Sequence, residues 1–227
     1  DMAEQLGFDL PSRPALGRSD FFVSPANALA LTLIEGWADW PEQKLVLTGP
    51  KGAGKTHLTH VWAEISGATL IAARDLSEDG VLELAQGPAA VEDAHTLAGD
   101  TSGQTTLFHL HNQMRAEGKP LLITGTGDVT AWGLTLPDLI SRLQAATAAK
   151  LDGPDDALLA AILIKLLADR QLTPSANLVP FLLKRMDRSF AAALDVVERL
   201  DAQSLAMGRP ITRALAANVL DSRASDT

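Results

Sequence analysis

The chain has 227 residues, of which 46% are hydrophobic and 21% are charged, a composition typical of globular proteins that bury a core. Its formal net charge of −9 disfavours binding to a nucleic-acid backbone, and no block of Lys and Arg offsets that charge. The lack of cysteine excludes disulfide bridges and thiolate-bound zinc. No apolar run approaches the ~18 residues of a membrane helix, and the N-terminus does not resemble a signal peptide, so we expect a soluble cytoplasmic protein.

The first two thirds of the chain predict an arm followed by an α/β domain. Residues 1–20 contain Pro and Gly without sustained periodicity, which indicates a flexible arm, and a helix is predicted from Pro25. Strands are predicted at 44–48, 68–73, 89–93 and 119–125, and further helices at 54–67, 105–118 and 137–146, whereas 147–151 has no clear pattern. Strands that alternate with helices predict a parallel sheet flanked by helices.

The pattern becomes purely helical after residues 151–154. Helical stretches are predicted at 155–170, 175–186, 189–208 and 211–221, separated by turn-forming Gly and Pro. We therefore expect three parts: an N-terminal arm at 1–20, an α/β nucleotide-binding domain at 21–152 and a small helical domain at 153–227.

The strongest functional motif lies between the first predicted strand and the next helix. It matches G-x-x-x-x-G-K-[ST], in which glycines let backbone N–H groups surround phosphate oxygens at a helix N-terminus. Lys55 would reach the β- and γ-phosphates, and Thr56 would bind Mg²⁺. The predicted nucleotide-binding residues of this phosphate loop are Gly49, Pro50, Lys51, Gly52, Ala53, Gly54, Lys55, Thr56 and His57.

Two acidic residues, Glu92 and Asp93, end a later predicted strand, where a phosphate-loop protein needs a second site for the metal and for water. We expect Glu92 to hold Mg²⁺ together with Thr56, although either carboxylate fits that role. ATPases of this type usually place Asp before the second acid, whereas Glu comes first here. Because a misplacement near 1 Å can cost on the order of 100-fold in rate, we expect nucleotide binding with weak or no intrinsic ATPase activity.

Together these motifs resemble the DnaA family of AAA+ proteins, and within it the short Hda-type members that inactivate the replication initiator DnaA. The resemblance runs from "FFVSPANALAL" through the phosphate loop and "VEDAH" to "TRALAANVL". It implies a AAA+ fold in which the helical domain is a lid, with ADP or ATP and Mg²⁺ as cofactors. The chain ends soon after the predicted lid helices, so we expect no reader domain and no sequence-specific DNA binding.

The resemblance also implies roles for three residues outside the phosphate loop. "LLITG" resembles the family's sensor-1 strand, with Thr124 as the side chain that senses the γ-phosphate. "PDLISRL" resembles the segment with the arginine finger, which makes Arg142 the candidate. "MDRSFAAALDVVERLD" resembles the lid helix with the sensor-2 arginine, assigned to Arg188.

The arm contains "QLGFDL", which resembles the short clamp-binding peptide of replication proteins. In such a peptide Gln5 would make polar contacts, while Leu6, Phe8 and Leu10 would anchor an extended segment in an apolar groove. The resemblance thus implies binding to the DNA polymerase sliding clamp through residues 5–10.

The implied function is negative regulation of replication initiation. Bound to the clamp, the chain would contact DnaA and supply Arg142 in trans to ATP held by DnaA, while its own oligomeric state, including a homo-oligomer, stays open. The alternatives are a AAA+ helicase loader or remodelling ATPase, a phosphate-loop kinase of small molecules, and a clamp adaptor whose phosphate loop no longer binds nucleotide.

Overall fold

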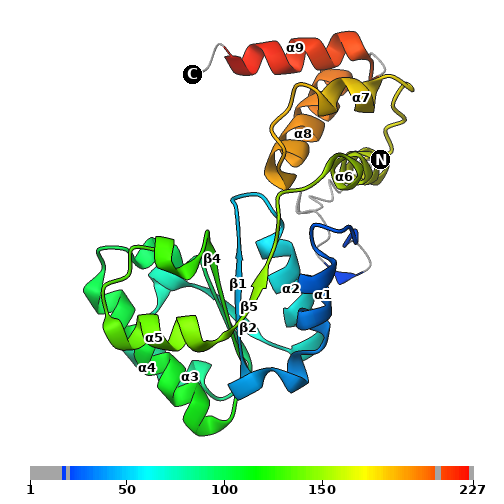
Figure 1. The fold of residues 1–227 in the computed structure, drawn as a ribbon. Helices are drawn as coiled ribbons and strands as arrows, with labels where there is room; N and C mark the ends of the chain where they lie inside the picture. The colour runs from blue at the N-terminus through cyan, green and yellow to red at the C-terminus, as the bar shows by residue number, and fades with distance from the viewer. Residues whose placement is uncertain (1–16, 19–20, 208–210, 225–227) are drawn as a thin grey trace, which may run out of the picture.

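A computed structural model describes residues 17–18, 21–207 and 211–224, which form a sheet domain and a group of helices beyond one end of it (Figure 1). The strands are β1 (Lys44–Gly49), β2 (Thr69–Ala72), β3 (Ala89–Glu92), β4 (Leu121–Thr126) and β5 (Thr147–Lys150). They lie in the order β2-β3-β4-β1-β5, and every neighbouring pair is parallel. Parallel strands share one carboxyl edge, so the loops that follow β1, β3 and β4 come together there.

Helices cover both faces of the sheet (Figure 1). One face carries α1 (Ala28–Glu35) and α2 (Lys55–Ser66), and the other carries α3 (Val81–Leu84), α4 (Thr101–Glu117) and α5 (Pro137–Ala145). Side chains of a strand alternate between the faces, so Leu45 and Leu47 pack with α1 and α2, whereas Val46 packs on the opposite side. Short 3₁₀ turns occupy Trp37–Asp39, Pro41–Gln43, Ala73–Asp75, Glu78–Gly80, Ala94–Leu97 and Val129–Ala131.

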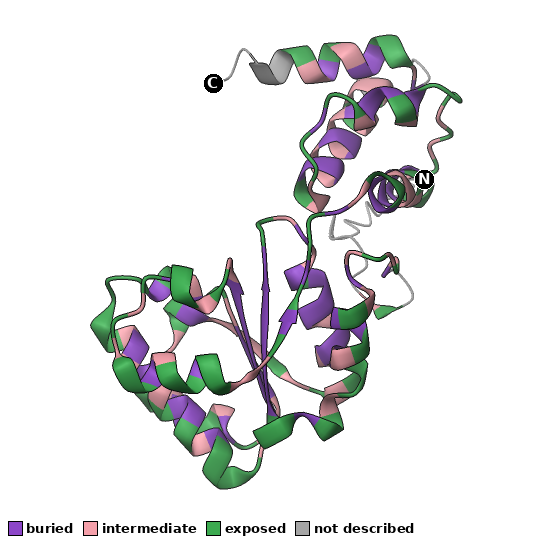
Figure 2. Cartoon of the chain, viewed as in Figure 1, coloured by how far each residue is buried: buried purple, intermediate pink, exposed green. Residues whose placement is uncertain are grey.

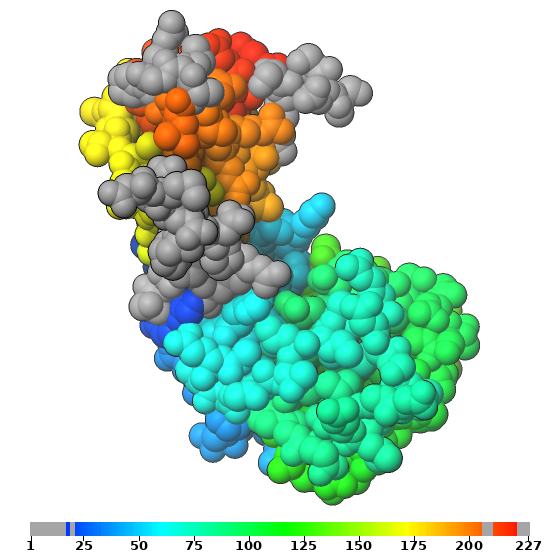
Figure 3. Space-filling model, turned by 180° about the vertical axis from the view of Figure 1, so that it is seen from behind, coloured from blue at the N-terminus to red at the C-terminus, as the bar shows by residue number. Residues whose placement is uncertain are grey.

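The remaining helices have a hydrophobic core of their own, separate from the two clusters of the sheet domain. They are α6 (Asp156–Asp169), α7 (Leu178–Leu183), α8 (Phe190–Met207) and α9 (Arg213–Ala224). Figure 2 shows buried positions facing inward in both groups, and Figure 3 shows the helical group as a lobe apart from the sheet domain. None of the helices in the described ranges has the length and apolar character needed to cross a membrane.

Among the elements that differ from the sequence prediction, three have a clear structural reason. The unassigned stretch at 147–151 contains β5, an edge strand whose Ala and Lys residues are poor strand formers, so pairing with β1 rather than propensity makes it a strand. α1 begins at Ala28 rather than at Pro25, because the Asn27 side chain accepts a hydrogen bond from the Ser24 amide (2.9 Å) and closes a turn. α4 begins at Thr101, capped by Asp100, four residues earlier than predicted.

Candidate functional site

The phosphate loop connects the end of β1 to the start of α2 at the carboxyl edge of the sheet. Gly52 and Gly54 have φ angles of +79° and +101°, a region that other L-residues rarely adopt. The following helix is 12 residues long and begins at Lys55, so the positive end of its dipole points at the loop. Loop and helix together form a site for phosphate groups.

Lys55 is held inside this loop. Its side chain is largely buried, and its Nζ donates hydrogen bonds to the carbonyl oxygens of Gly49 (2.8 Å) and Pro50 (2.9 Å). Burial lowers the pKa of Lys55, whereas the nearby charge of Asp93 raises it. The Lys55 ammonium group is therefore already ordered close to an acidic side chain, next to the loop's backbone N–H groups.

A cleft of about 520 Å³ opens beside the loop. Its size lies within the range of small-molecule sites. Its walls come from the sheet domain and from the group of helices α6–α9, which we call the lid. The lining residues are Lys51, Gly52, Gly54, Lys55, Thr56, His57, Asp93, His95, Thr126, Phe190 and Ala191.

Of the two acidic residues, the structure places Asp93 in the cleft, and Glu92 is not among the lining residues. Asp93 has a left-handed backbone (φ 59°), and its amide donates a hydrogen bond to Thr124 Oγ1 at 3.1 Å, which fixes the turn after β3. Burial, and then the charge of Asp93, raise the pKa of Glu92. The geometry favours Asp93 as the carboxylate that would lie nearest to phosphates bound in the cleft. The assignment of Mg²⁺ to Glu92 stays a prediction.

The described residues contain no group of three or more His, Asp or Glu side chains suited to a metal ion. A Mg²⁺ ion in this cleft would need phosphate oxygens and water among its ligands, which is its usual coordination beside nucleotides. Thr56 and Asp93 both line the cleft and carry oxygen ligands of the right kind. The residues therefore fit a magnesium–nucleotide complex better than a free ion.

Four residues that line the cleft were not predicted from the sequence: His95, Thr126, Phe190 and Ala191. Thr124, the predicted γ-phosphate sensor, is 2% exposed and supports the Asp93 turn, whereas Thr126 ends β4 at the cleft. The Thr126 amide donates to His95 Nδ1 (3.0 Å), so a neutral His95 carries its proton on Nε2. Strand alternation was the available signal for Thr126, because it lies two residues beyond Thr124 and faces the same side.

The lid touches the phosphate loop directly. The Phe190 amide, at the start of α8, donates a hydrogen bond to the Gly52 carbonyl at 3.0 Å. Ser189 packs so closely that a Cβ on Gly52 would lie 2.3 Å from the Ser189 Cβ. The position of the lid and the conformation of the loop are therefore coupled at Gly52.

Arg188, the predicted sensor-2 residue, lies just before this contact. Its Nη1 pairs with Asp156 Oδ1 at the start of α6, and both side chains are exposed. Arg188 is not among the residues that line the cleft. Its role as a sensor of bound phosphate therefore stays a prediction, and it would require the guanidinium group to leave Asp156.

An apolar pocket adjoins the cleft and shares Gly52, Gly54, His57 and Phe190 with it. Its other walls come from the segment before α1 and from the lid: Phe21, Phe22, Asn27, Ala53, Pro154, Leu158 and Ile162. His57 packs edge-on against Phe21, with ring centroids 5.1 Å apart, and lies 6.0 Å from the Phe190 ring. The apolar pocket has a volume of about 30 Å³, so its walls would have to move apart to admit a flat apolar group next to a phosphate chain.

Alanine at Gly52 tests the contact between lid and loop. We expect Gly52→Ala to cost about 1–3 kcal/mol of unfolding free energy from the positive φ, and to displace the lid because of Ser189. Gly99→Ala is the matched control, because Gly99 has a φ of +75° but nothing within 4 Å of an added Cβ. Chemical unfolding and small-angle scattering measure both effects. An equal response of the two variants would mean that the Ser189 contact is unimportant.

Arg142 lies at the opposite edge of the sheet from the phosphate loop. It is exposed in the last turn of α5, and its charge lowers the pKa of Lys44, the first residue of β1. The loop of the same chain starts after Gly49, the last residue of β1, about 16 Å further along the strand. The structure thus separates Arg142 from the other predicted site residues.

Lys44 forms a buried pair beneath β1. Its Nζ donates a hydrogen bond to His111 Nε2 at 2.7 Å, and both side chains are less than 5% exposed. An ammonium group has no acceptor, so this bond needs a neutral His111 with its proton on Nδ1, which lies 3.2 Å from Asn112 Oδ1. Burial first, and then the charge of Lys44, lower the pKa of His111.

This pair predicts a loss of stability in mild acid. Unfolded His111 binds a proton near pH 6.5 whereas the folded form resists it, so stability falls as pH drops below about 6.5. His111→Gln keeps an acceptor for Lys44 without titrating, and we expect a smaller drop in Tm between pH 7 and pH 5 than in the wild type. His60→Gln, at a half-buried position of α2, is the control. Identical pH profiles for the His111 variant and the wild type would contradict this prediction.

The predicted clamp peptide residues Gln5, Leu6, Phe8 and Leu10 lie outside the described residues. Arg18, near the first described residue, attaches the chain to the sheet domain. The Arg18 amide donates to Glu64 Oε2 at 3.3 Å, and the Arg18 guanidinium pairs with Glu35 at 2.5 Å.

No family model matches the chain. Its structure is similar to that of domain III of the replication initiation protein DnaA from Thermotoga maritima, with a TM-score of 0.82 and 22% identity over 92% of this chain and 97% of that one. AMPPCP-bound DnaA from Aquifex aeolicus gives a TM-score of 0.72 and 16% identity, over 86% and 67% of the two chains. The RuvB Holliday junction branch migration motor of Thermotoga maritima also gives 0.72 and 16%, over 93% and 72%.

These similarities define a DnaA-like AAA+ fold: a parallel sheet with helices on both faces, followed by a helical lid. The predicted fold class is confirmed. At these levels of identity the comparisons concern the fold, and the resemblance to the Hda-type members stays a prediction.

Proposed function

We propose that this chain is a AAA+ protein that binds ADP or ATP with Mg²⁺ and regulates the initiation of DNA replication. Lys55, Thr56 and Asp93 would hold the phosphates and the metal in the cleft, while the adjoining apolar pocket would open to receive the adenine. The similarity to a DnaA bound to AMPPCP, an ATP analogue, supports an adenine nucleotide. The bound nucleotide would set the angle of the lid through the Gly52 contact.

The regulatory step would be stimulation of ATP hydrolysis by DnaA, with Arg142 acting in trans. One observation carries this proposal: Arg142 is exposed at the edge of the sheet that lies away from its own phosphate loop. From there its guanidinium group can meet only the nucleotide of another chain. A cation at that position stabilises the charge that develops on the phosphoryl group during transfer.

The arm would bring the chain to DNA. Residues 5–10 would bind the sliding clamp, with Gln5 in a polar pocket and the three large apolar residues in a groove. Attachment to the clamp would raise the local concentration of the regulator near DNA that carries the clamp. The support for this step is the sequence resemblance.

The test is hydrolysis of DnaA-bound ATP with the clamp loaded on DNA, in the presence and absence of this chain. We expect a faster reaction with the chain, and a loss of the clamp's contribution in Gln5→Ala, whose substitution lies far from the cleft in sequence. An unchanged rate of hydrolysis with the wild-type chain would rule out the regulator.

A remodelling ATPase is the second candidate, and the position of Asp93 favours it. Asp93 lines the cleft close enough to Lys55 for its charge to offset part of the lowering of the Lys55 pKa by burial, so an acidic group lies where hydrolysis by the chain itself requires one. The structural similarity to the RuvB motor is compatible with this function. Steady-state ATPase activity of the isolated chain separates the two: rapid turnover that is lost in Asp93→Asn would favour the remodeller.

A further inference from the structure

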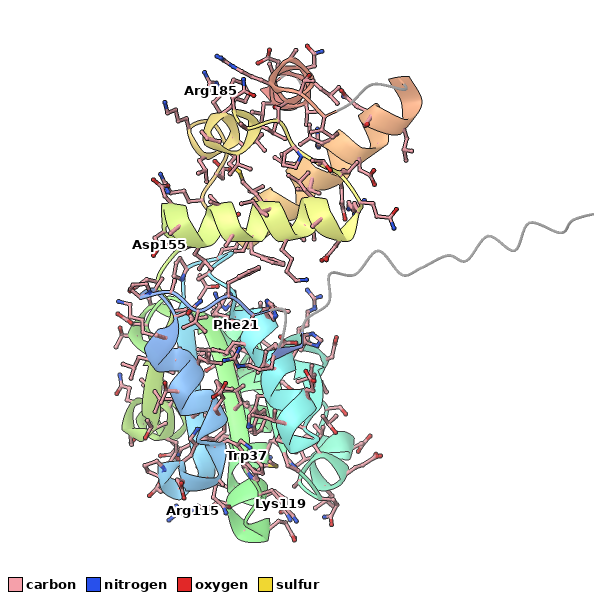
Figure 4. The ribbon with its side chains drawn as sticks, turned by 90° about the vertical axis from the view of Figure 1, so that its right-hand side faces the viewer. Phe21, Trp37, Arg115, Lys119, Asp155 and Arg185 are labelled. Carbon is pink, nitrogen blue, oxygen red and sulfur yellow. The ribbon has the colours of Figure 1, made fainter. Side chains whose placement is uncertain are left out.

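Basic side chains surround the small pocket beneath β1, at the amino edge of the sheet. The described residues that line the pocket are Glu42, Gln43, Lys44, His111, Met114, Arg115, Lys119 and Leu121. Only Glu42 among them is acidic. Figure 4 shows Arg115 and Lys119 at the end of the sheet domain that lies away from the lid.

Arg115 lines this pocket from α4, and the charge of Arg142 on α5 acts on two of the buried residues that line it. Arg115 follows His111 by one helical turn of α4, so both side chains lie on the same face of that helix. Arg142 approaches from α5, which packs against α4. The charges of Arg115 and Arg142 both act on the same two buried groups, Lys44 and His111, and lower the pKa of each.

Such a cluster carries more positive than negative charge. Arg115, Arg142 and Lys44 repel one another, and Glu42, 3.8 Å from Lys44 Nζ, is the one carboxylate among the described residues that line the pocket. The negative ends of α4 and α5 offset part of the repulsion. Lys44 is nevertheless buried beside a neutral histidine, which does not compensate its positive charge. This local positive charge contrasts with the net charge of −9 of the whole chain. The cluster therefore forms a local positive region that attracts anions.

We propose that Arg115 acts with Arg142 as a second cation that contacts the phosphates of the nucleotide bound by another AAA+ chain. This inference rests on the proposed function, because it concerns the same face and the same partner. The buried Lys44–His111 pair would fix the end of α4 against β1, so that Arg115 is presented beside Arg142. Two guanidinium groups from separate helices would hold the transferred phosphoryl group more firmly than one.

The experiment compares Arg115→Gln, Arg142→Gln and Arg74→Gln in the DnaA-bound ATP hydrolysis assay, at increasing concentrations of the chain. Arg74 is an exposed arginine on the far side of the sheet domain and serves as the control. We expect Arg115→Gln to lower the saturating rate by about tenfold, with an unchanged half-saturating concentration, and Arg115→Lys to restore part of it. Arg74→Gln should behave as the wild type, and equal Tm values would show that all variants fold.

Two results would overturn the inference without contradicting the proposed regulatory function, provided that Arg142→Gln still removes the stimulation. In the first, Arg115→Gln behaves as Arg74→Gln does. In the second, Arg115→Gln changes the half-saturating concentration alone. The second result would mean that Arg115 aids docking without touching the phosphates. If the wild-type chain gives no stimulation, the proposed function fails and the inference fails with it.

Discussion

Arg142→Ala is expected to reduce stimulation of DnaA-bound ATP hydrolysis by about 10³-fold or more, which brings it to the rate without the chain. An arginine finger accelerates hydrolysis by about 10³–10⁵-fold, because its charge stabilises the transition state more than the ground state. Since Arg142 is exposed and far from its own cleft, the variant should fold normally and bind nucleotide as the wild type does. Single-turnover hydrolysis measures the first effect, and nucleotide titration measures the second.

The control for this variant is Arg74→Ala, which removes an exposed arginine from a different region of the same domain. It should keep full stimulation. A strong loss in both variants would indicate a general effect of net charge on association, which added salt would reveal. Full stimulation by Arg142→Ala would show that Arg142 is not an arginine finger.

Lys55→Met is expected to weaken binding of ADP and ATP by on the order of 10²-fold. The ammonium group would contribute charge-assisted hydrogen bonds to phosphate oxygens, and methionine keeps most of the side-chain volume in this buried position. Because burial disfavours the charged form of Lys55, the substitution should leave thermal stability without ligand nearly unchanged. Isothermal titration calorimetry with both nucleotides tests the prediction.

Lys51→Met is the matched control in the same loop. Lys51 is exposed and lines the outer part of the cleft, so its replacement should weaken nucleotide binding only a few-fold. Equal affinities of Lys55→Met and the wild type would mean that the phosphate loop does not hold nucleotide. In that case the chain would be a clamp adaptor with an inactive loop.

Under the proposed function, effects of nucleotide on the lid would depend on the contact at Gly52. The lid reaches the loop through backbone and small side chains, namely the Phe190 amide and Ser189, so a shift of the loop by a bound phosphate would pass directly to α8. The apolar pocket is formed by the segment before α1, the loop and the lid, so a bound base would contact all three. These contacts would give the nucleotide a structural role that does not require its hydrolysis.

The sequence alone predicted the features that local pattern controls. Buried strands such as 44–48, the helix after the phosphate loop and the helices of the lid were predictable from hydrophobic periodicity, because each buries one face or stripe. The phosphate loop was predictable because its glycines, lysine and threonine are contiguous in sequence. The order of strands and the edge strand β5 were not, since Thr147–Lys150 becomes a strand only by pairing with β1.

Only the tertiary structure distinguished residues that the sequence leaves equivalent. Glu92 and Asp93 are neighbours with the same charge, and the turn held by Thr124 decides that Asp93 lines the cleft. Thr124 and Thr126 share one face of a strand, and the position of the strand end decides which one reaches the cleft. The cluster of Lys44, His111, Arg115 and Arg142 draws on the start of β1 and on the last turns of α4 and α5, which meet because the parallel strands share an amino edge. Contiguous motifs were thus fixed by sequence, whereas groups assembled from several elements depended on how the sheet and its helices pack.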